Sequence, residues 1–210
     1  MCITASIAFC WSLFQLWYAS PLPYLFGTGV FIDVPARAIH LAFALTICFL
    51  LFPFSKLWQR SNFNFFDLWL SLISCACCLY LYFEYKAIVD RNGVLLRVLL
   101  ELLGSDFNIA VELIIGMLGI LLLLEATRRA IGLPLVIVAA VFLGYSVFGQ
   151  TMPDLIAHQG LSFSRLIGYQ WLGGEAIFGI PISVSVSFVF LFVLFGSMLD
   201  KAGGGKYFLD

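Results

Sequence analysis

Two stretches of the sequence decide the fold: Ala130–Pro153, AIGLPLVIVAAVFLGYSVFGQTMP, and Ala176–Leu199, AIFGIPISVSVSFVFLFVLFGSML. Neither stretch contains an Asp, Glu, Lys or Arg residue. As a helix, each would be roughly 36 Å long, because an α-helix rises about 1.5 Å per residue. The hydrocarbon core of a bilayer is about 30 Å thick. The two stretches therefore predict two membrane-spanning helices.

The composition of the whole chain points to the membrane as well. Hydrophobic residues make up 62% of the 210 positions and charged residues 11%, whereas a soluble domain has about 25% charged residues. The net charge of −1, with no basic run, gives no indication of a nucleic-acid partner. We therefore expect an all-α polytopic membrane protein that is surrounded by the lipid bilayer.

Apolar runs bounded by charged or helix-breaking residues predict six crossings in total. The fourth run is the least apolar, because it contains Glu112. The first run lacks the basic n-region that precedes the apolar core of a secretory signal peptide, so we read it as a helix of the mature protein. The six predicted helices are Thr4–Tyr18, Arg37–Pro53, Asp67–Tyr85, Asn108–Leu124, Ala130–Pro153 and Ala176–Leu199.

Two further segments suit the plane of the membrane interface. Val94–Leu103 is too charged to span and too apolar for a plain loop, so we expect a helix that lies in the interface. In Leu155–Leu172, Tyr169 and Trp171 are expected at the level of the lipid headgroups, where aromatic rings are enriched.

The distribution of Lys and Arg predicts the orientation in the membrane. Three of the five basic residues on one side lie in the long segment between helices three and four, where the positive-inside rule counts least. We therefore place both termini in the cytoplasm, in a multi-pass protein of the cell inner membrane. The predicted cytoplasmic side holds Lys56, Arg60, Arg128, Arg129, Lys201 and Lys206, and the other side holds Arg37, Lys86, Arg91, Arg97 and Arg165.

The sequence shows no pattern typical of an enzyme or a metal site. His40 and His158 lie in distant segments, and neither has a nucleophile or a ligand beside it. There is no phosphate-binding loop and no His-Glu-x-x-His helix, and the cysteines lack the paired Cys-x-x-Cys spacing with a nearby His that zinc sites favour. We therefore expect no catalytic residue, no bound metal and no cofactor.

Charged residues near helix ends are the first candidates for a role. A carboxylate inside a membrane is costly and often functional, although Glu112 lies close enough to its helix start to reach the interface instead. Glu125 forms i,i+3 and i,i+4 pairs with Arg128 and Arg129. This group is either an ordinary helix terminus with cations near its negative pole or an anchor at a domain joint.

Three serines alternate in the last predicted helix, at positions 183, 185 and 187. Ser183 and Ser187 share one face of an α-helix, since they are four residues apart. They are therefore the candidate residues of a substrate pathway. The alternative is that these hydroxyls donate to backbone carbonyls one turn earlier.

Several strings of the sequence occur together in one known family. They resemble the fused permeases of tripartite ATP-independent periplasmic (TRAP) transporters, particularly the TAXI branch, over nearly the whole chain. The strings are Arg37-Ala-Ile-His40-Leu-Ala-Phe, the series Tyr85, Arg91, Gly93 and Asp106, the string Glu125-Ala-Thr-Arg-Arg129-Ala-Ile-Gly-Leu-Pro134, and Phe192-Val-Leu-Phe-Gly196-Ser-Met-Leu-Asp200-Lys-Ala-Gly203.

The resemblance implies both a domain organisation and an activity. Residues 1–129 would form a four-helix scaffold like the small subunit, and residues 130–210 would begin the large permease domain, which moves the substrate by an elevator motion. The activity would be uptake of an organic anion, dicarboxylate-like, with an ion gradient, usually sodium, and a periplasmic substrate-binding protein.

The length of the chain qualifies this expectation. The sequence stops at Asp210, before the later re-entrant hairpins of such permeases, so the resemblance implies an N-terminal fragment. Its partners would be the remaining large-domain helices, which would also bind the coupling ion. The alternative function is that of a non-transporting structural or accessory membrane subunit.

Overall fold

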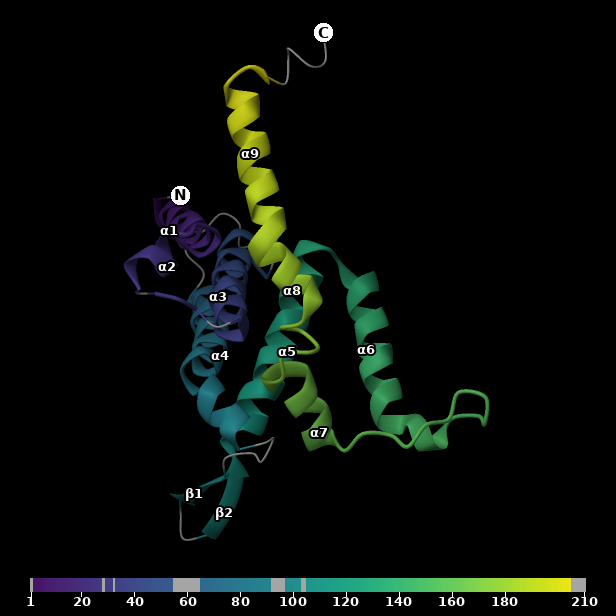
Figure 1. Cartoon of the computed structure of the whole chain (residues 1–210). Helices are drawn as coiled ribbons and strands as arrows, with labels where there is room; N and C mark the ends of the chain where they lie inside the picture. The colour runs from purple at the N-terminus through teal and green to yellow at the C-terminus, as the bar shows by residue number, and fades with distance from the viewer. Residues whose placement is uncertain are drawn as a thin grey trace.

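Helices dominate the architecture (Figure 1). The computed structural model describes residues 2–27, 29–31, 33–54, 65–91, 97–102 and 105–204. Three of the basic residues predicted on the cytoplasmic side, Lys56, Arg60 and Lys206, lie outside these residues, as does Gly93. The helices are α1 (Cys2–Ala19), α2 (Leu22–Phe26), α3 (Asp33–Leu51), α4 (Phe65–Asp90), α5 (Val111–Ala130), α6 (Leu133–Phe148), α7 (Phe163–Ile167), α8 (Ile180–Val184) and α9 (Phe190–Lys201), the strands are β1 (Arg97–Leu102) and β2 (Ser105–Ala110), and the shorter turns are the 3-10 turn η2 (Gly149–Thr151) and the π-helical turns η3 (Gly168–Leu172) and η4 (Ser185–Val189).

Each of the six predicted crossings contains a helix, which confirms the predicted fold class. Helices α1, α3, α4, α5 and α6 correspond to the first five crossings, and α8, η4 and α9 form one continuous stretch for the sixth. The chain is therefore a multi-pass helical membrane protein. Within the described residues, four stretches are long and apolar enough to cross a bilayer: Asp33–Leu51, Phe65–Asp90, Leu133–Thr151 and Ile180–Lys201.

Prolines set the starts of the last two crossings. Pro134 and Pro181 both lie in the first turn of their helices, where the missing N–H of proline costs nothing. The sixth crossing therefore begins at Ile180 and not at Ala176. Gly132, with φ of 120°, makes the turn between α5 and α6, a conformation that residues with a Cβ rarely adopt.

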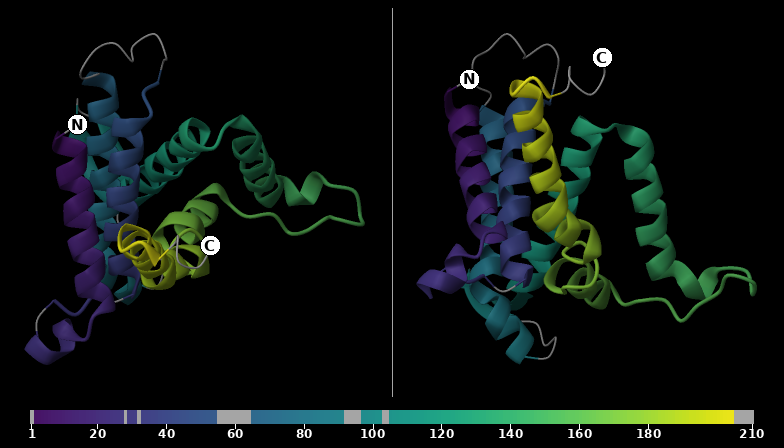
Figure 2. Two further views of the ribbon diagram at one scale, coloured as in Figure 1. Left: turned by 90° about the horizontal axis from the view of Figure 1, so that it is seen from above. Right: turned by 45° about the horizontal axis from the view of Figure 1, so that its top comes forward.

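Helices α1, α3, α4 and α5 pack together as the N-terminal bundle, with α3 in contact with the other three (Figure 2). The buried residues of α4 recur at intervals of three and four, so they form one face of the helix. Many of them are small, which lets neighbouring helices approach closely. This face includes Asp67, Ser71, Ser74, Cys78 and Leu81.

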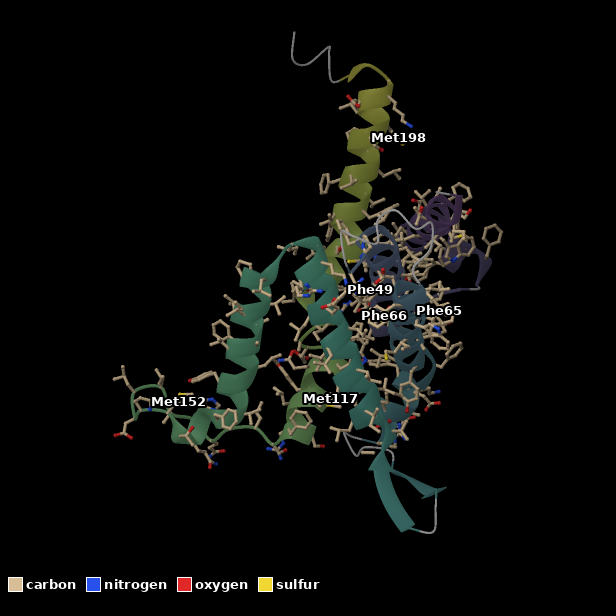
Figure 3. All side chains as sticks on the ribbon, turned by 180° about the vertical axis from the view of Figure 1, so that it is seen from behind. Phe49, Phe65, Phe66, Met117, Met152 and Met198 are labelled. Carbon is tan, nitrogen blue, oxygen red and sulfur yellow. The ribbon has the colours of Figure 1, made fainter. Side chains whose placement is uncertain are left out.

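The fifth and sixth crossings have far fewer buried side chains than helices α3 and α4 of the N-terminal bundle. Helix α6 stands apart from the N-terminal bundle, and α9 extends beyond it (Figure 1). Neither helix contains a buried side chain within the described part of the chain. Met198 of α9 lies far from the core residue Phe49 (Figure 3).

The predicted interfacial helix at Val94–Leu103 is wrong. In the described part of this segment, Arg97–Leu102 is a strand, and it pairs antiparallel with Ser105–Ala110 in a hairpin that projects below the bundle (Figure 1). A short apolar run does not distinguish a helix from a strand by its periodicity. The partner strand decides the outcome here, and it also moves the start of the fourth crossing from Asn108 to Val111.

The predicted headgroup position of Trp171 is also wrong. Its side chain is fully buried, whereas Tyr169 is exposed. The indole lies against α5 at Gly116 and Gly119, where an added Cβ would overlap Trp171 or its neighbour Ile167. Two glycines one turn apart thus create the groove that receives the ring.

Candidate functional site

The predicted group at the end of α5 is an extended ionic cluster. Arg128 donates two hydrogen bonds to the Glu125 carboxylate, each 2.7 Å long. Arg129 donates to Glu125 Oε1 at 2.8 Å and to Asp67 Oδ1 of α4 at 2.7 Å. It also donates to the carbonyl oxygen of Phe52, just after α3, at 3.1 Å. We call Asp67, Glu125, Arg128 and Arg129 the basic end cluster.

The two arginines of the basic end cluster differ in their surroundings. The side chain of Arg129 is 2% exposed and that of Arg128 is 36% exposed. The Arg129 guanidinium also lies over the rings of Phe49 and Phe54, at 5.0 and 5.5 Å from their centroids. Arg129 therefore ties α3, α4 and α5 together at one end of the N-terminal bundle, which is more than an ordinary helix terminus does.

The same arginines lower the pKa of Glu125, which lies beyond the apolar part of α5. Hydrogen bonds from Arg128, and then those from Arg129, hold the pKa of Glu125 below its ordinary value, although partial burial opposes this shift. The carboxylate is thus kept ionised between two cations. The sequence spacing predicted this part of the cluster, but not the contact with Asp67.

Glu112 is buried within the bundle and paired with a residue of another segment. Its side chain is 1% exposed and forms an ion pair of 2.5 Å with Arg91, at the end of α4. A buried carboxylate needs such a partner, because an isolated charge is costly in an apolar environment. The pair holds the end of α4 against the first turn of α5, where the hairpin joins the bundle (Figure 1).

The three serines of the sixth crossing have different partners. Ser187 donates to the carbonyl oxygen of Ser183 at 2.8 Å, which confirms for Ser187 the alternative of bonding to the preceding turn. Ser185, the serine that the spacing argument left out, lies 3.1 Å from His40 Nε2 of α3. One turn before His40, Arg37 donates to the carbonyl oxygen of Phe178 at 2.9 Å.

A cavity of about 340 Å³ lies beside Ser187, between the end of α1 and the last crossing. Polar side chains border it together with apolar ones, so it could accept a ligand with polar groups. Ser183 is not among the lining residues. The lining is Tyr18, Ala19, Tyr24, Phe31, Asp33, Ser187, Phe188 and Leu191.

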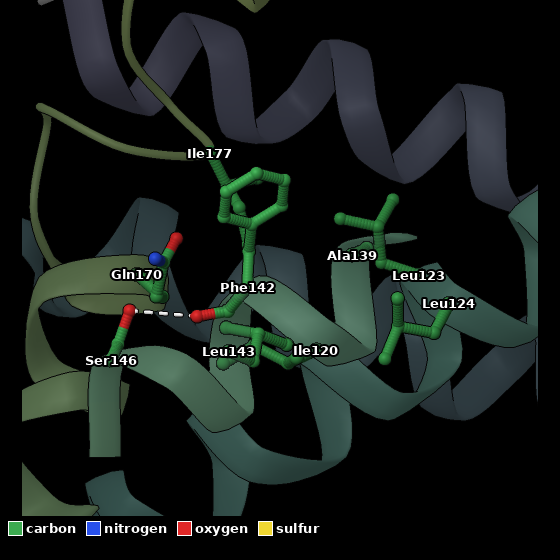
Figure 4. A pocket seen from close by; sticks show the side chains of 9 residues that line it. All are labelled: Ile120, Leu123, Leu124, Ala139, Phe142, Leu143, Ser146, Gln170 and Ile177. Carbon is green, nitrogen blue, oxygen red and sulfur yellow. Dashed lines mark hydrogen bonds between the residues drawn. The ribbon is translucent and has the colours of Figure 1, made fainter. Parts of the chain in front are cut away.

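Two further cavities lie between α5 and α6. One of about 260 Å³ has Ser146 and Gln170 at one end and apolar side chains elsewhere (Figure 4). The Ser146 hydroxyl donates to the carbonyl oxygen of Phe142 at 2.9 Å. The other cavity, of about 420 Å³, is lined by apolar side chains and Gly144. Neither offers a charged group to an organic anion.

The described residues contain no group of three or more His, Cys, Asp or Glu side chains that could hold a metal ion. Several polar side chains instead pair between helices, such as Arg129 with Asp67 and His40 with Ser185. Arg91, Asp67 and Ser185 are the partners that sequence reasoning missed. Their charges and hydroxyls were visible, but their partners lie on other helices.

The C-terminal part of the chain is similar to one known family. Residues 118–210 match the family of the tripartite ATP-independent periplasmic transporter, DctM component. The match confirms the resemblance to TRAP permeases over the region from the middle of α5 to the end of the chain. No curated protein and no solved structure matches the sequence.

Proposed function

We propose that this chain is a membrane component of a TRAP-type secondary transporter, of the TAXI branch, that imports an organic anion such as a dicarboxylate. A periplasmic substrate-binding protein would deliver the anion, and an ion gradient, with sodium as the coupling ion, would drive its uptake. The observation that carries this proposal is the DctM match over residues 118–210, a region that contains two of the four long apolar crossings.

The N-terminal bundle supports a scaffold role for residues 1–129. Two ion pairs, Arg91 with buried Glu112 and Arg129 with buried Asp67, join its helices to one another. We propose that residues 130–210 begin the large permease domain. The exposed apolar faces of α6 and α9 agree with this role, because they remain available to further helices of that domain.

Uptake measurements test the transport proposal. Cells that contain the complete transport system should accumulate radiolabelled dicarboxylate in the presence of a sodium gradient, and deletion of this chain should abolish the accumulation. Restoring the chain should restore it. Unchanged uptake without the chain would contradict a transport role and favour the alternative, a structural or accessory membrane subunit.

We also propose that the chain lies in the inner membrane with both termini in the cytoplasm. Ile131, in the turn between α5 and α6, and Gln159, in the loop after α6, are exposed and lie beyond opposite ends of α6. In a background without other cysteines, Gln159→Cys should react with an impermeant maleimide in spheroplasts, and Ile131→Cys only after permeabilisation. The reverse pattern would invert the proposed orientation.

A further inference from the structure

His40 is a buried histidine that touches two other crossings through both of its ring nitrogens. On one side, Trp11 Nε1 of α1 lies 3.2 Å from His40 Nδ1, and the Gln15 side-chain amide contacts the same nitrogen. On the other side, His40 Nε2 lies 3.1 Å from Ser185 Oγ. We call Trp11, Gln15, His40 and Ser185 the polar joint.

Trp11 determines which ring nitrogen of His40 carries the proton. An indole N–H can only donate a hydrogen bond, so the nitrogen that faces it must accept. His40 Nδ1 is therefore unprotonated, the ring is neutral, and Nε2–H donates to the Ser185 hydroxyl. A Gln15 side chain turned to offer its oxygen would require a proton on Nδ1, and Trp11 would then lose its acceptor.

Ser185 lies in a part of the last crossing that is unusual in its backbone. It begins the π-helical turn η4, and such turns are rare insertions that often occur at functional positions. Ser187, two residues later, is bonded within its own helix. The hydrogen bond from α3 to this turn is thus made at Ser185, and Arg37 holds the preceding segment through the Phe178 carbonyl.

We propose that His40 is a positioning residue that accepts from Trp11 on α1, donates to Ser185, and thereby fixes the π-helical turn of the last crossing against the N-terminal bundle. Arg37 and His40 are three residues apart and so lie on one face of α3. This face attaches the segment from Phe178 to Ser185 at two points. The proposal concerns packing between helices and does not depend on which substrate is transported.

A matched pair of serine variants tests the attachment. In the purified chain in nanodiscs, Ser185→Ala should speed backbone hydrogen exchange in residues 185–192 by roughly twofold to tenfold, as expected for loss of one partly buried hydrogen bond between helices. Ser187→Ala should leave exchange near that of the parent, because its hydroxyl bonds within the same helix. Equal exchange in the two variants would overturn the proposal.

Two variants of His40 distinguish the hydrogen bond at Nδ1 from the one at Nε2. The side-chain amide of His40→Gln extends toward the position of Nε2 and should retain the bond to Ser185. The shorter side chain of His40→Asn places its oxygen near the position of Nδ1, so it should keep the hydrogen bond from Trp11 but lose the one to Ser185. Backbone hydrogen exchange in this variant should therefore be as fast as in Ser185→Ala. Slow exchange in His40→Asn would show that Ser185 is not held by the ring.

The proton on His40 has its own spectroscopic signature. The chain contains two histidines, so 15N-histidine labelling gives two imidazole rings, and His158→Asn assigns them. His40 Nδ1 should show the shift of an unprotonated nitrogen, and Ser185→Ala should move the His40 Nε2 signal most. A proton on His40 Nδ1 in the parent chain would contradict the polar joint.

Discussion

Helices α3 and α4 of the N-terminal bundle and the crossings that contain α6 and α9 are all long and apolar enough to span a membrane, yet they are buried to different extents. Half of the most apolar window of α3 is buried, against 6% for the crossings that contain α6 and α9. The buried faces of α3 and α4 contain Ala, Ser, Cys, His and Asp. The exposed faces of α6 and α9 consist largely of Val, Leu, Ile and Phe.

This difference shows that apolarity and packing are separate properties in a membrane. Lipid tails are as apolar as leucine, so large aliphatic residues gain little by leaving lipid for protein. Small residues allow close backbone approach, and polar residues require partners. Small and polar residues on the buried faces of α3 and α4 thus hold the N-terminal bundle together alongside well-packed apolar residues such as Phe49.

The largest expected difference is between two phenylalanines. Phe49 of α3 is fully buried, whereas Phe192 of α9 is 73% exposed. Phe49→Ala should lower the free energy of unfolding by about 3–5 kcal/mol, since it leaves a cavity in the core. Phe192→Ala should change it by less than about 1 kcal/mol. Denaturation in mixed micelles, followed by circular dichroism, measures both, and equal losses would remove the distinction between the two regions.

A smaller loss is expected at the basic end cluster. Arg129→Ala removes the cation next to buried Asp67 and should cost about 3 kcal/mol. Arg128→Ala, at a half-exposed position on the same turn, should cost about 0–1 kcal/mol. Thermal unfolding in detergent compares them.

Charge reversal sharpens this comparison of the two arginines. Replacing both Arg128 and Arg129 with Glu gives three neighbouring acidic groups, the two new side chains and Glu125. It also removes basic residues from the proposed cytoplasmic side. This double variant should fail to accumulate in the membrane. If it accumulates like the parent chain, the basic end cluster does not anchor the bundle.

The smallest effect is expected from two glycine substitutions. Gly119→Ala would place a methyl group against the Trp171 ring and should cost about 1–3 kcal/mol. A methyl group at Gly144 of α6 would meet no atom within 4 Å, so Gly144→Ala should be neutral or slightly stabilising, because Ala favours helix more than Gly does. Chemical denaturation of both variants provides the test, and a tolerated Gly119→Ala would mean that α5 and Trp171 separate easily.

Local patterns predicted the helices well and the contacts between them poorly. The spacing of Glu125, Arg128 and Arg129 was sufficient to predict their ion pairs, because i,i+3 and i,i+4 neighbours meet on any helix. Trp171 was misplaced because its local sequence suits an interface. The groove that receives it is made by two glycines on α5, more than fifty residues earlier in the chain.

The sequence by itself determined that this chain spans a membrane as a set of helices, because the length of an uncharged run and the cost of exposing backbone polar groups to lipid act within each segment. Only the tertiary structure decided which polar residues meet: Arg129 with Asp67, Arg91 with Glu112, and His40 with Ser185. Each of these pairs joins two different segments of the chain. Their geometry depends on helix rotation and depth, which small residues and turns set jointly.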